Sequence, residues 1–222
     1  MQWLISLIII LIPFYVVRFS VVGIPTTIIE VLIYLSAITL LVSQPLSLTG
    51  NRIKERFIKL RVPLAWLIIG TILATIIAPD LRTALGLAKG YIFDPLLLSL
   101  VIIGWQGSDR FKDQLTVALL ASGLVVGMSA IFGPRNIEGR ALGIYSLDVS
   151  PSPNFIALYL APIATLGLFA AFNRIKLLPL PWLWLANLIM LFGLYLSGSR
   201  GGILAISICL AITIIYWSHW SN

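Results

Sequence analysis

One arginine of this chain lies where its charge needs an explanation. Segment 194–202 reads Leu-Tyr-Leu-Ser-Gly-Ser-Arg-Gly-Gly and places Arg200 between two apolar runs, 182–196 and 203–217. An arginine at the centre of a membrane-spanning helix costs about 2.5–3.5 kcal/mol. The neighbouring glycines permit a sharp turn and the close approach of a second backbone or a ligand. Arg200 is therefore either an anchor at the interfacial end of a helix or a contact for an anionic group, and the segment alone leaves both interpretations open.

A second group of candidate residues lies about fifty positions earlier. Segment 133–145 contains Arg135 and Arg140, and Asn154 opens the next apolar run. The planar guanidinium of arginine matches the oxygens of a phosphate and stays charged in any surroundings. Asn154 has two interpretations of similar weight, a helix N-cap or a hydrogen bond to a substrate. These residue types favour a site for a phosphate or diphosphate.

The composition is that of a membrane protein. Hydrophobic residues make up 59% of the 222 residues and charged residues 10%, and the mean hydropathy is +1.04. The apolar stretches recur in blocks of about 16–22 residues, the length at which an α-helix crosses a bilayer. We therefore expect an all-α bundle of about eight spans that forms a single transmembrane domain over residues 1–222. The expected spans are 3–19, 26–42, 63–78, 91–105, 115–132, 154–172, 182–196 and 203–217.

The basic residues predict the orientation of this bundle. Segment 51–61 carries five basic residues and is either a loop or an interfacial helix on anionic lipid. Such a cluster beside a span is typical of the cytoplasmic side in both cases. The N-terminus is then cytoplasmic too, whereas 80–90, 133–153 and Arg200 lie outside. Nine basic residues fall inside in this arrangement, in 51–61, 107–114 and 173–176, and six fall outside. The net charge of +7 thus reflects membrane orientation, and we expect no nucleic-acid partner.

Two carboxylates fall within the expected spans. Asp94 lies near the outer end of span 91–105, where we expect it to be in water or paired with one of the outer arginines. Glu30 lies within span 26–42, and the sequence does not identify its partner.

Two segments resemble those of the O-antigen ligase family. The first is L-x-L-S-x-S-R-G-G at 194–202, and the second is G-R-x-x-G at 139–143 followed by P-N-x-x-A-x-Y-L at 153–160. In the second segment Arg140, Gly143, Pro153 and Asn154 match the family pattern. The intervening stretch is slightly long, which leaves the position of Asp148 open. Members of this family are integral membrane proteins that transfer or polymerise glycans carried on polyprenyl pyrophosphate lipids.

The resemblance implies a glycosyltransferase, a ligase or a polymerase, on the outer face of the inner (cytoplasmic) membrane. Its donor would be a polyprenyl-pyrophosphate-linked glycan, and its acceptor a lipid or a protein. We expect Arg140 and Arg200 to be catalytic through contacts with the pyrophosphate, and Arg135, Asn154 and Ser199 to bind substrate. The sequence contains no P-loop, no H-E-x-x-H and no Cys/His cluster, so we expect neither a metal nor another cofactor. The non-catalytic alternative is a transporter or a subunit that binds a lipid head group.

The resemblance also places this chain against the N-terminal portion of the family. Family members continue into further spans and a large outer loop, whose basic and histidine residues contribute to the reaction. We therefore expect a fragment or a shortened form, in which a general base for the acceptor hydroxyl is not evident. The sugar, the acceptor and the choice between ligase and polymerase stay open.

Overall fold

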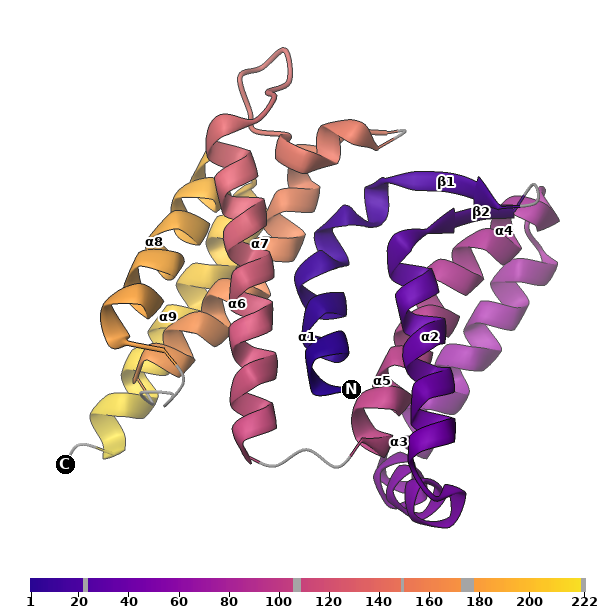
Figure 1. Cartoon of the computed structure of the whole chain (residues 1–222). Coiled ribbons are helices and arrows are strands. Elements are labelled where there is room, and N and C mark those ends of the chain that lie inside the picture. Colours follow the sequence, from indigo (N-terminus) through magenta and orange to yellow (C-terminus); the bar gives the residue numbers. More distant parts are fainter. Residues whose placement is uncertain (22–23, 106–108, 149, 173–177, 221–222) are drawn as a thin grey trace. The chain divides into compact units, whose positions relative to one another are not determined.

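The computed structural model describes residues 1–21, 24–105, 109–148, 150–172 and 178–220. In this part the chain is almost wholly helical, as expected, with one small sheet (Figure 1). The elements in order are α1 (Gln2–Leu11), η1 (Ile12–Val16), β1 (Arg18–Val21), β2 (Ile24–Thr27), α2 (Ile28–Ser43), α3 (Leu46–Ile76), α4 (Leu81–Ala88), the π-helical η2 (Lys89–Phe93), α5 (Asp94–Gly104), α6 (Asp109–Phe132), the 3-10 helix η3 (Gly143–Leu147), α7 (Pro153–Phe172), α8 (Leu180–Leu196) and α9 (Arg200–Trp220).

Four of the described helices are long and apolar enough to cross a membrane. They are Phe57–Ile76, Leu81–Gly104, Arg110–Phe132 and Pro153–Phe172. Shorter apolar helices occupy Gln2–Val16, Ile28–Ser43, Leu180–Leu196 and Arg200–Ile212. Each expected span thus contains an apolar helix, whereas eight crossings and a cytoplasmic N-terminus stay predictions. The expected cytoplasmic loop at 173–176 lies outside the described residues.

The connection between the first two helices forms a β-hairpin, where the sequence predicted a plain loop. Strands β1 and β2 pair antiparallel, with Arg18 opposite Thr27 and Val21 opposite Ile24. β-Branched and aromatic side chains such as Phe19 and Thr26 favour extended backbone. This hairpin is the exception to the all-α prediction.

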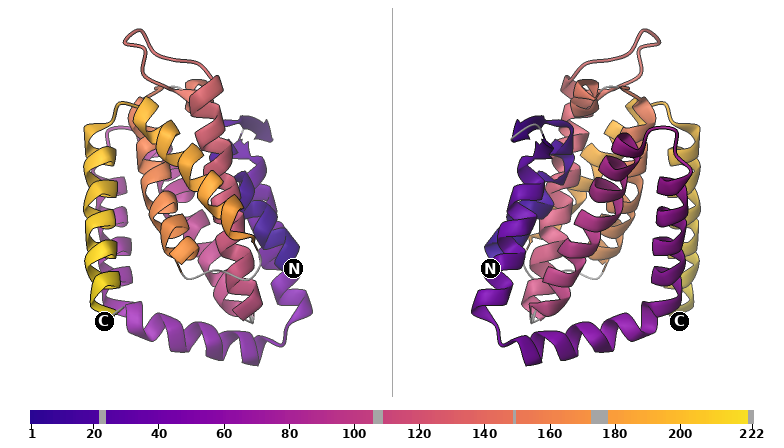
Figure 2. Two further views of the ribbon diagram at one scale, coloured as in Figure 1. Left: turned by 90° about the vertical axis from the view of Figure 1, so that its left-hand side faces the viewer. Right: turned by 90° about the vertical axis from the view of Figure 1, so that its right-hand side faces the viewer.

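The basic segment 51–61 is helical, which agrees with its interpretation as a helix and not with that as a loop. Its place at the membrane interface stays a prediction. The segment lies within α3, a continuous helix of 31 residues. The segment consists largely of good helix formers and contains neither glycine nor proline, so the helix continues through it. Pro63 lies inside α3, and an internal proline kinks a helix. Figure 2 shows α3 (purple) sharply bent, with its N-terminal part lying across the direction of its C-terminal part.

The expected outer loop 80–90 is also helical. Asp80 caps α4, because its Oδ1 accepts hydrogen bonds from the backbone N–H groups of Arg82 (3.0 Å) and Thr83 (3.3 Å). Helix α4 continues through the π-helical turn η2 into α5, which gives one apolar helix from Leu81 to Gly104. The hydrogen bonds from Thr83 and the backbone hold the pKa of this exposed Asp80 carboxyl below its usual value.

Packing divides the chain into two compact units. Unit 1 comprises Met1–Ile5 and Glu30–Ser108, and unit 2 comprises Ser6–Ile29 and Asp109–Asn222. Within unit 1, α3 packs against α4 and α5. Tyr34 of α2 contacts Asp94 at the start of α5, and Leu40 lies against Gly104 at its end. Helices α2 and α5 therefore run in the same direction.

Unit 2 is built around one apolar core. Helices α6, α7 and α8 pack on one another, and α9 packs on α7. The core draws on all four helices and on the segments η1 and η3, through residues such as Val126, Leu160, Met190, Ile206 and Tyr145. Tyr145 is only 1% exposed, and its ring lies about 6 Å from those of Tyr15, Phe155 and Tyr159. This core holds α7 and α9, which line the candidate site together with the loop before α7 and the turn before α9.

Candidate functional site

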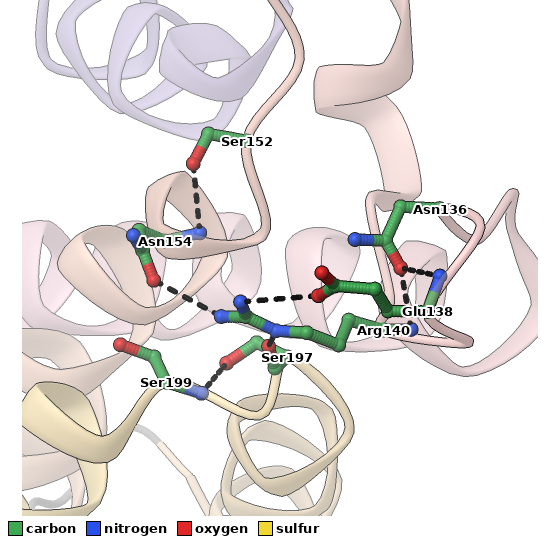
Figure 3. A network of polar contacts seen from close by, with 7 residues as sticks. All are labelled: Asn136, Glu138, Arg140, Ser152, Asn154, Ser197 and Ser199. Atoms are coloured by element: carbon green, nitrogen blue, oxygen red, sulfur yellow. Dashed lines mark hydrogen bonds and ion pairs between the residues drawn. The ribbon is translucent and has the colours of Figure 1, made fainter.

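Two connections meet at one end of unit 2. The first is the 133–152 loop between α6 and α7, and the second is the 197–199 turn between α8 and α9 (Figure 3). The backbone N–H of Ala141 donates to the carbonyl of Leu196 at 2.9 Å, which fastens the loop to the end of α8. Arg140 and Arg200 both lie at this end of unit 2, and its orientation toward the outer face stays a prediction.

The tip of the loop is a turn that its own polar groups hold. The Oδ1 atom of Asn136 accepts from the backbone N–H groups of Glu138 (3.1 Å) and Arg140 (2.8 Å). Arg135 and Ala141 form an isolated antiparallel bridge at the base of this turn. An asparagine side chain that bonds the backbone two residues on is a common way to stabilise such a turn. The turn thereby sets the position of the Arg140 backbone.

The Arg140 guanidinium joins the loop, α7 and the α8–α9 turn. Its Nε donates to the Ser197 carbonyl at 2.8 Å, and one terminal nitrogen donates to Asn154 Oδ1 at 3.1 Å. The other terminal nitrogen lies 3.9 Å from a carboxylate oxygen of Glu138 (Figure 3). The side chain keeps 31% of its surface exposed. Arg140 is therefore held in place by three contacts and is still open to a ligand.

Glycine makes the α8–α9 turn possible. Gly198 has φ +60°, a conformation that other residues adopt at a cost. A Cβ on Gly198 would also lie 3.0 Å from Nε of Arg140. Four residues later, a Cβ on Gly202 would lie 2.7 Å from the Cβ of Ala157, so α9 approaches α7 closely there. The predicted sharp turn and close approach are thus both confirmed.

Arg200 is the first residue of α9, and it is exposed. Its guanidinium group forms no hydrogen bond or ion pair with any residue that the structure describes. Ser199 precedes it and caps the helix, with its hydroxyl accepting from the backbone N–H of Gly202 at 3.4 Å. The cap leaves the Ser199 hydroxyl hydrogen free to donate elsewhere. The start of α9 thus presents one unpaired cation and one hydroxyl.

Asn154 does not cap α7. The helix begins at Pro153, and the hydroxyl of Ser152 accepts from the backbone N–H of Asn154 at 3.3 Å. A serine cap followed by proline at the first helical position is a favourable N-terminus. The interpretation of Asn154 as the cap is therefore wrong. Its side chain is instead directed to Arg140 (Figure 3).

A cavity of about 930 Å³ lies between these groups. Four of the five predicted site residues line it: Arg140, Asn154, Ser199 and Arg200. Its apolar wall comes from α7 and α9, and includes Leu158 and Ala205. The fifth, Arg135, does not line the cavity, and its guanidinium donates to the Gly139 carbonyl of its own turn at 3.2 Å. The structure thus joins two sequence-distant segments around one open space.

Sequence reasoning missed Glu138. This residue also lines the cavity, and its side chain is 66% exposed. The sequence could have indicated Glu138 through its position two residues before Arg140, in the turn that Asn136 stabilises. The lining therefore carries two guanidinium groups and one carboxylate. The excess positive charge suits an anionic ligand.

Tyr145, in η3 between the two ends of this loop, is not a candidate for proton transfer. Burial raises the pKa of its phenol, so the hydroxyl stays neutral at physiological pH. Its role is to pack the loop against the core.

Comparison with protein-family models, with curated proteins and with solved structures gave no match.

Proposed function

We propose that the protein is a membrane glycosyltransferase whose donor is a glycan linked to polyprenyl pyrophosphate. The acceptor is a lipid or a protein on the outer face of the inner membrane. The observation that carries the proposal is the pairing of Arg140, held by Ser197 and Asn154, with the unpaired Arg200 on one cavity. The cavity also borders the N-terminus of α9, where backbone N–H groups favour an anion.

The proposed reaction needs positive charge at the departing group. The acceptor oxygen attacks the anomeric carbon, the bond from that carbon to the diphosphate oxygen breaks, and the electron pair leaves with the diphosphate. Fixed cations that face this developing charge stabilise the transition state more than the bound substrate. In the proposal Arg140 supplies the fixed cation and Arg200 the one that closes on the substrate. Ser199 and Asn154 then contribute hydrogen bonds to the same head group.

The acceptor hydroxyl must also lose its proton. We assign this step to Glu138, whose exposed carboxylate lines the same cavity as both arginines. Its contact with Arg140 at 3.9 Å is loose enough to be replaced by an acceptor hydroxyl. A carboxylate positioned within reach of the proton it removes is a common general base.

The proposal is tested with the full-length protein in liposomes that contain a lipid-linked glycan donor and an acceptor. Arg200→Ala should lose about 10²–10³-fold in transfer rate, the loss measured when one transition-state contact is removed. Arg200→Lys should lose most of the activity as well, because lysine keeps the charge but not the planar fork of donors. Arg135→Ala is the matched control and should transfer at the wild-type rate.

Glu138→Gln separates an enzyme from a subunit that only binds a lipid head group. If Glu138 is the general base, the Gln variant binds the donor as tightly as the wild type but transfers it slowly. A different outcome would identify a binding subunit. In that case the wild type binds the donor but releases no lipid diphosphate, and the Arg200→Ala variant no longer binds the donor. Wild-type transfer by Arg200→Ala would reject the assignment and leave Arg200 as an interfacial anchor.

A further inference from the structure

A second set of ionisable residues lies in unit 1. Helix α2 contributes Glu30 and Tyr34, whereas Lys89 and Asp94 come from η2 and the start of α5. All four belong to unit 1 and lie in apolar helices. Ionisable side chains inside apolar spans are expensive and are commonly functional. The sequence expectation that Asp94 lies in water or pairs with an outer arginine is wrong.

The π-helical turn brings the two residues of the second helix together. In η2 the backbone N–H of Asp94 bonds the carbonyl of Lys89, five residues earlier. In an ordinary α-helix, residues five apart point in clearly different directions, at about 100° per residue. The wider π-turn reduces this difference, and such turns occur frequently at functional sites. Lys89 and Asp94 thereby both face α2.

The charges of this cluster do not cancel. Lys89 forms an ion pair with Glu30, and its ammonium group lies 5.9 Å from the centre of the Tyr34 ring. Asp94 accepts a hydrogen bond only from a neutral group, the Tyr34 hydroxyl, which donates to its Oδ1 at 2.8 Å. Two carboxylates and one ammonium leave one negative charge when all are ionised. That charge falls on Asp94, the carboxylate without a cation as its direct partner among the described residues.

Asp94 is also the most enclosed member of the cluster. Its residue is 3% exposed, and Oδ2 has no hydrogen-bond partner among the described residues. Helix α3, which packs on α5, brings no compensating charge, because it has no ionisable residue from Val62 to Ile76. A buried carboxylate oxygen without a donor is costly as an anion, and a single proton on Oδ2 removes that charge.

The remaining members are more exposed than Asp94. The Lys89 side chain is 32% exposed and that of Glu30 is 15% exposed. Tyr34 follows on the same helix and contacts Asp94. Exposure falls from Lys89 through Glu30 to Asp94.

We propose that Asp94 is a proton-binding site inside the apolar part of unit 1, in a cluster whose more exposed members are Lys89 and Glu30. The step is a simple protonation, in which Oδ2 of the carboxylate takes up one proton and Oδ1 keeps its hydrogen bond from Tyr34. This site is independent of the arginine cavity in unit 2.

Infrared spectroscopy of the full chain in lipid nanodiscs tests this directly. With the aspartate carboxyl carbons isotopically labelled, a protonated aspartate gives a distinct C=O stretching band. We expect such a band above about pH 5, where an exposed aspartate with its usual pKa of about 3.9 is ionised. The band should be lost in Asp94→Asn and kept in the matched control Asp80→Asn, because the exposed Asp80 lies outside the spans. No band above this pH, or a band lost in Asp80→Asn, would overturn the proposal.

A second variant decides the matter if Asp94→Asn does not fold. Tyr34→Phe removes the donor to Oδ1, so the C=O band should move to higher frequency without loss of intensity. An unchanged frequency would mean that the protonated group is not Asp94. A band that disappears on addition of Na⁺ at constant pH would overturn the proposal in favour of a metal-cation site.

Discussion

The two units use their helices in opposite ways. In unit 1 none of the residues in the apolar stretch of α3 is buried, and 11% of those in the apolar stretch of Leu81–Gly104 are buried. In unit 2 the corresponding shares are 39% for Arg110–Phe132 and 50% for Pro153–Phe172. The spanning helices of unit 1 thus leave most of their apolar side chains exposed and enclose the carboxylate of Asp94, whereas unit 2 buries a larger apolar core.

The physical meaning of this difference depends on the solvent. In a bilayer, apolar side chains gain little by leaving lipid for protein, so packing and polar contacts hold helices together. Unit 1 relies on polar contacts between its helices, such as Tyr34–Asp94 and Lys89–Glu30. Unit 2 relies on close packing, as where Gly202 meets Ala157. The two units should therefore respond differently to the same kind of substitution.

The largest expected effect concerns the cavity of unit 2. Arg140→Ala should lose about 10²–10³-fold in glycan transfer, as for Arg200→Ala, and should also destabilise the protein. The reason is that Arg140 ties Ser197 and Asn154 together, whereas Arg200 has no partner among the described residues. Transfer assays and SDS titration of the folded protein in mixed micelles measure the two effects. Equal stability of the two variants would contradict the structural role of Arg140.

A matched pair of leucines tests the packing of the two units. Leu160 is fully buried in unit 2, and Leu73 of α3 is 56% exposed. Leu160→Ala should lower the free energy of unfolding by about 2 kcal/mol, the low end for a buried leucine, because the unfolded chain stays in lipid. Leu73→Ala should change it little. SDS titration of both variants is the measurement, and a large effect at Leu73 would reveal a partner surface on α3.

Two glycines of the same turn test its backbone. Gly198→Ala should cost about 1–2 kcal/mol, because an alanine must adopt a positive φ and its Cβ meets Arg140. Gly201→Ala should be neutral or stabilising, since nothing lies within 4 Å of its Cβ position and alanine favours helix. Thermal unfolding of the two variants compares them. Equal melting temperatures would show that the turn adapts to a side chain.

The smallest expected effect is that of a tyrosine hydroxyl in unit 2, Tyr159, and a tyrosine hydroxyl of unit 1 serves as its comparison. Tyr34→Phe should cost about 1–3 kcal/mol, because it leaves the buried Asp94 without its donor. Tyr159→Phe should cost only about 0.6 kcal/mol, a common value for hydrogen bonds between membrane helices. The partner of Tyr159, Ser122, keeps its bond to the Leu119 carbonyl at 2.7 Å. If Tyr159→Phe proves the costlier change in SDS titration, polar contacts do not distinguish unit 1 from unit 2.

The sequence by itself determined the helices and the turn at Arg200. Backbone groups in hydrocarbon must bond within their own segment, so long apolar runs become helices whatever surrounds them. The serine and glycine residues around Arg200 also indicate the end of one helix and the start of the next in any context. The sequence left 51–61 open between a loop and a helix, and it placed 80–90 outside the span that follows. Charge alone does not break a helix, so 51–61 lies within α3 and 81–88 continues into α5.

Only the tertiary structure decided which polar groups meet. Arg140 reaches Ser197, 57 residues away, and Asp94 reaches Tyr34, 60 residues away. Such partners follow from how helices pack, and packing depends on side-chain shapes such as the missing Cβ of Gly202, which no local pattern encodes. The turn made by Asn136 likewise decides which side chains line the cavity. Glu138 lines it although the sequence did not predict this, and Arg135 does not line it although the sequence placed it in the site.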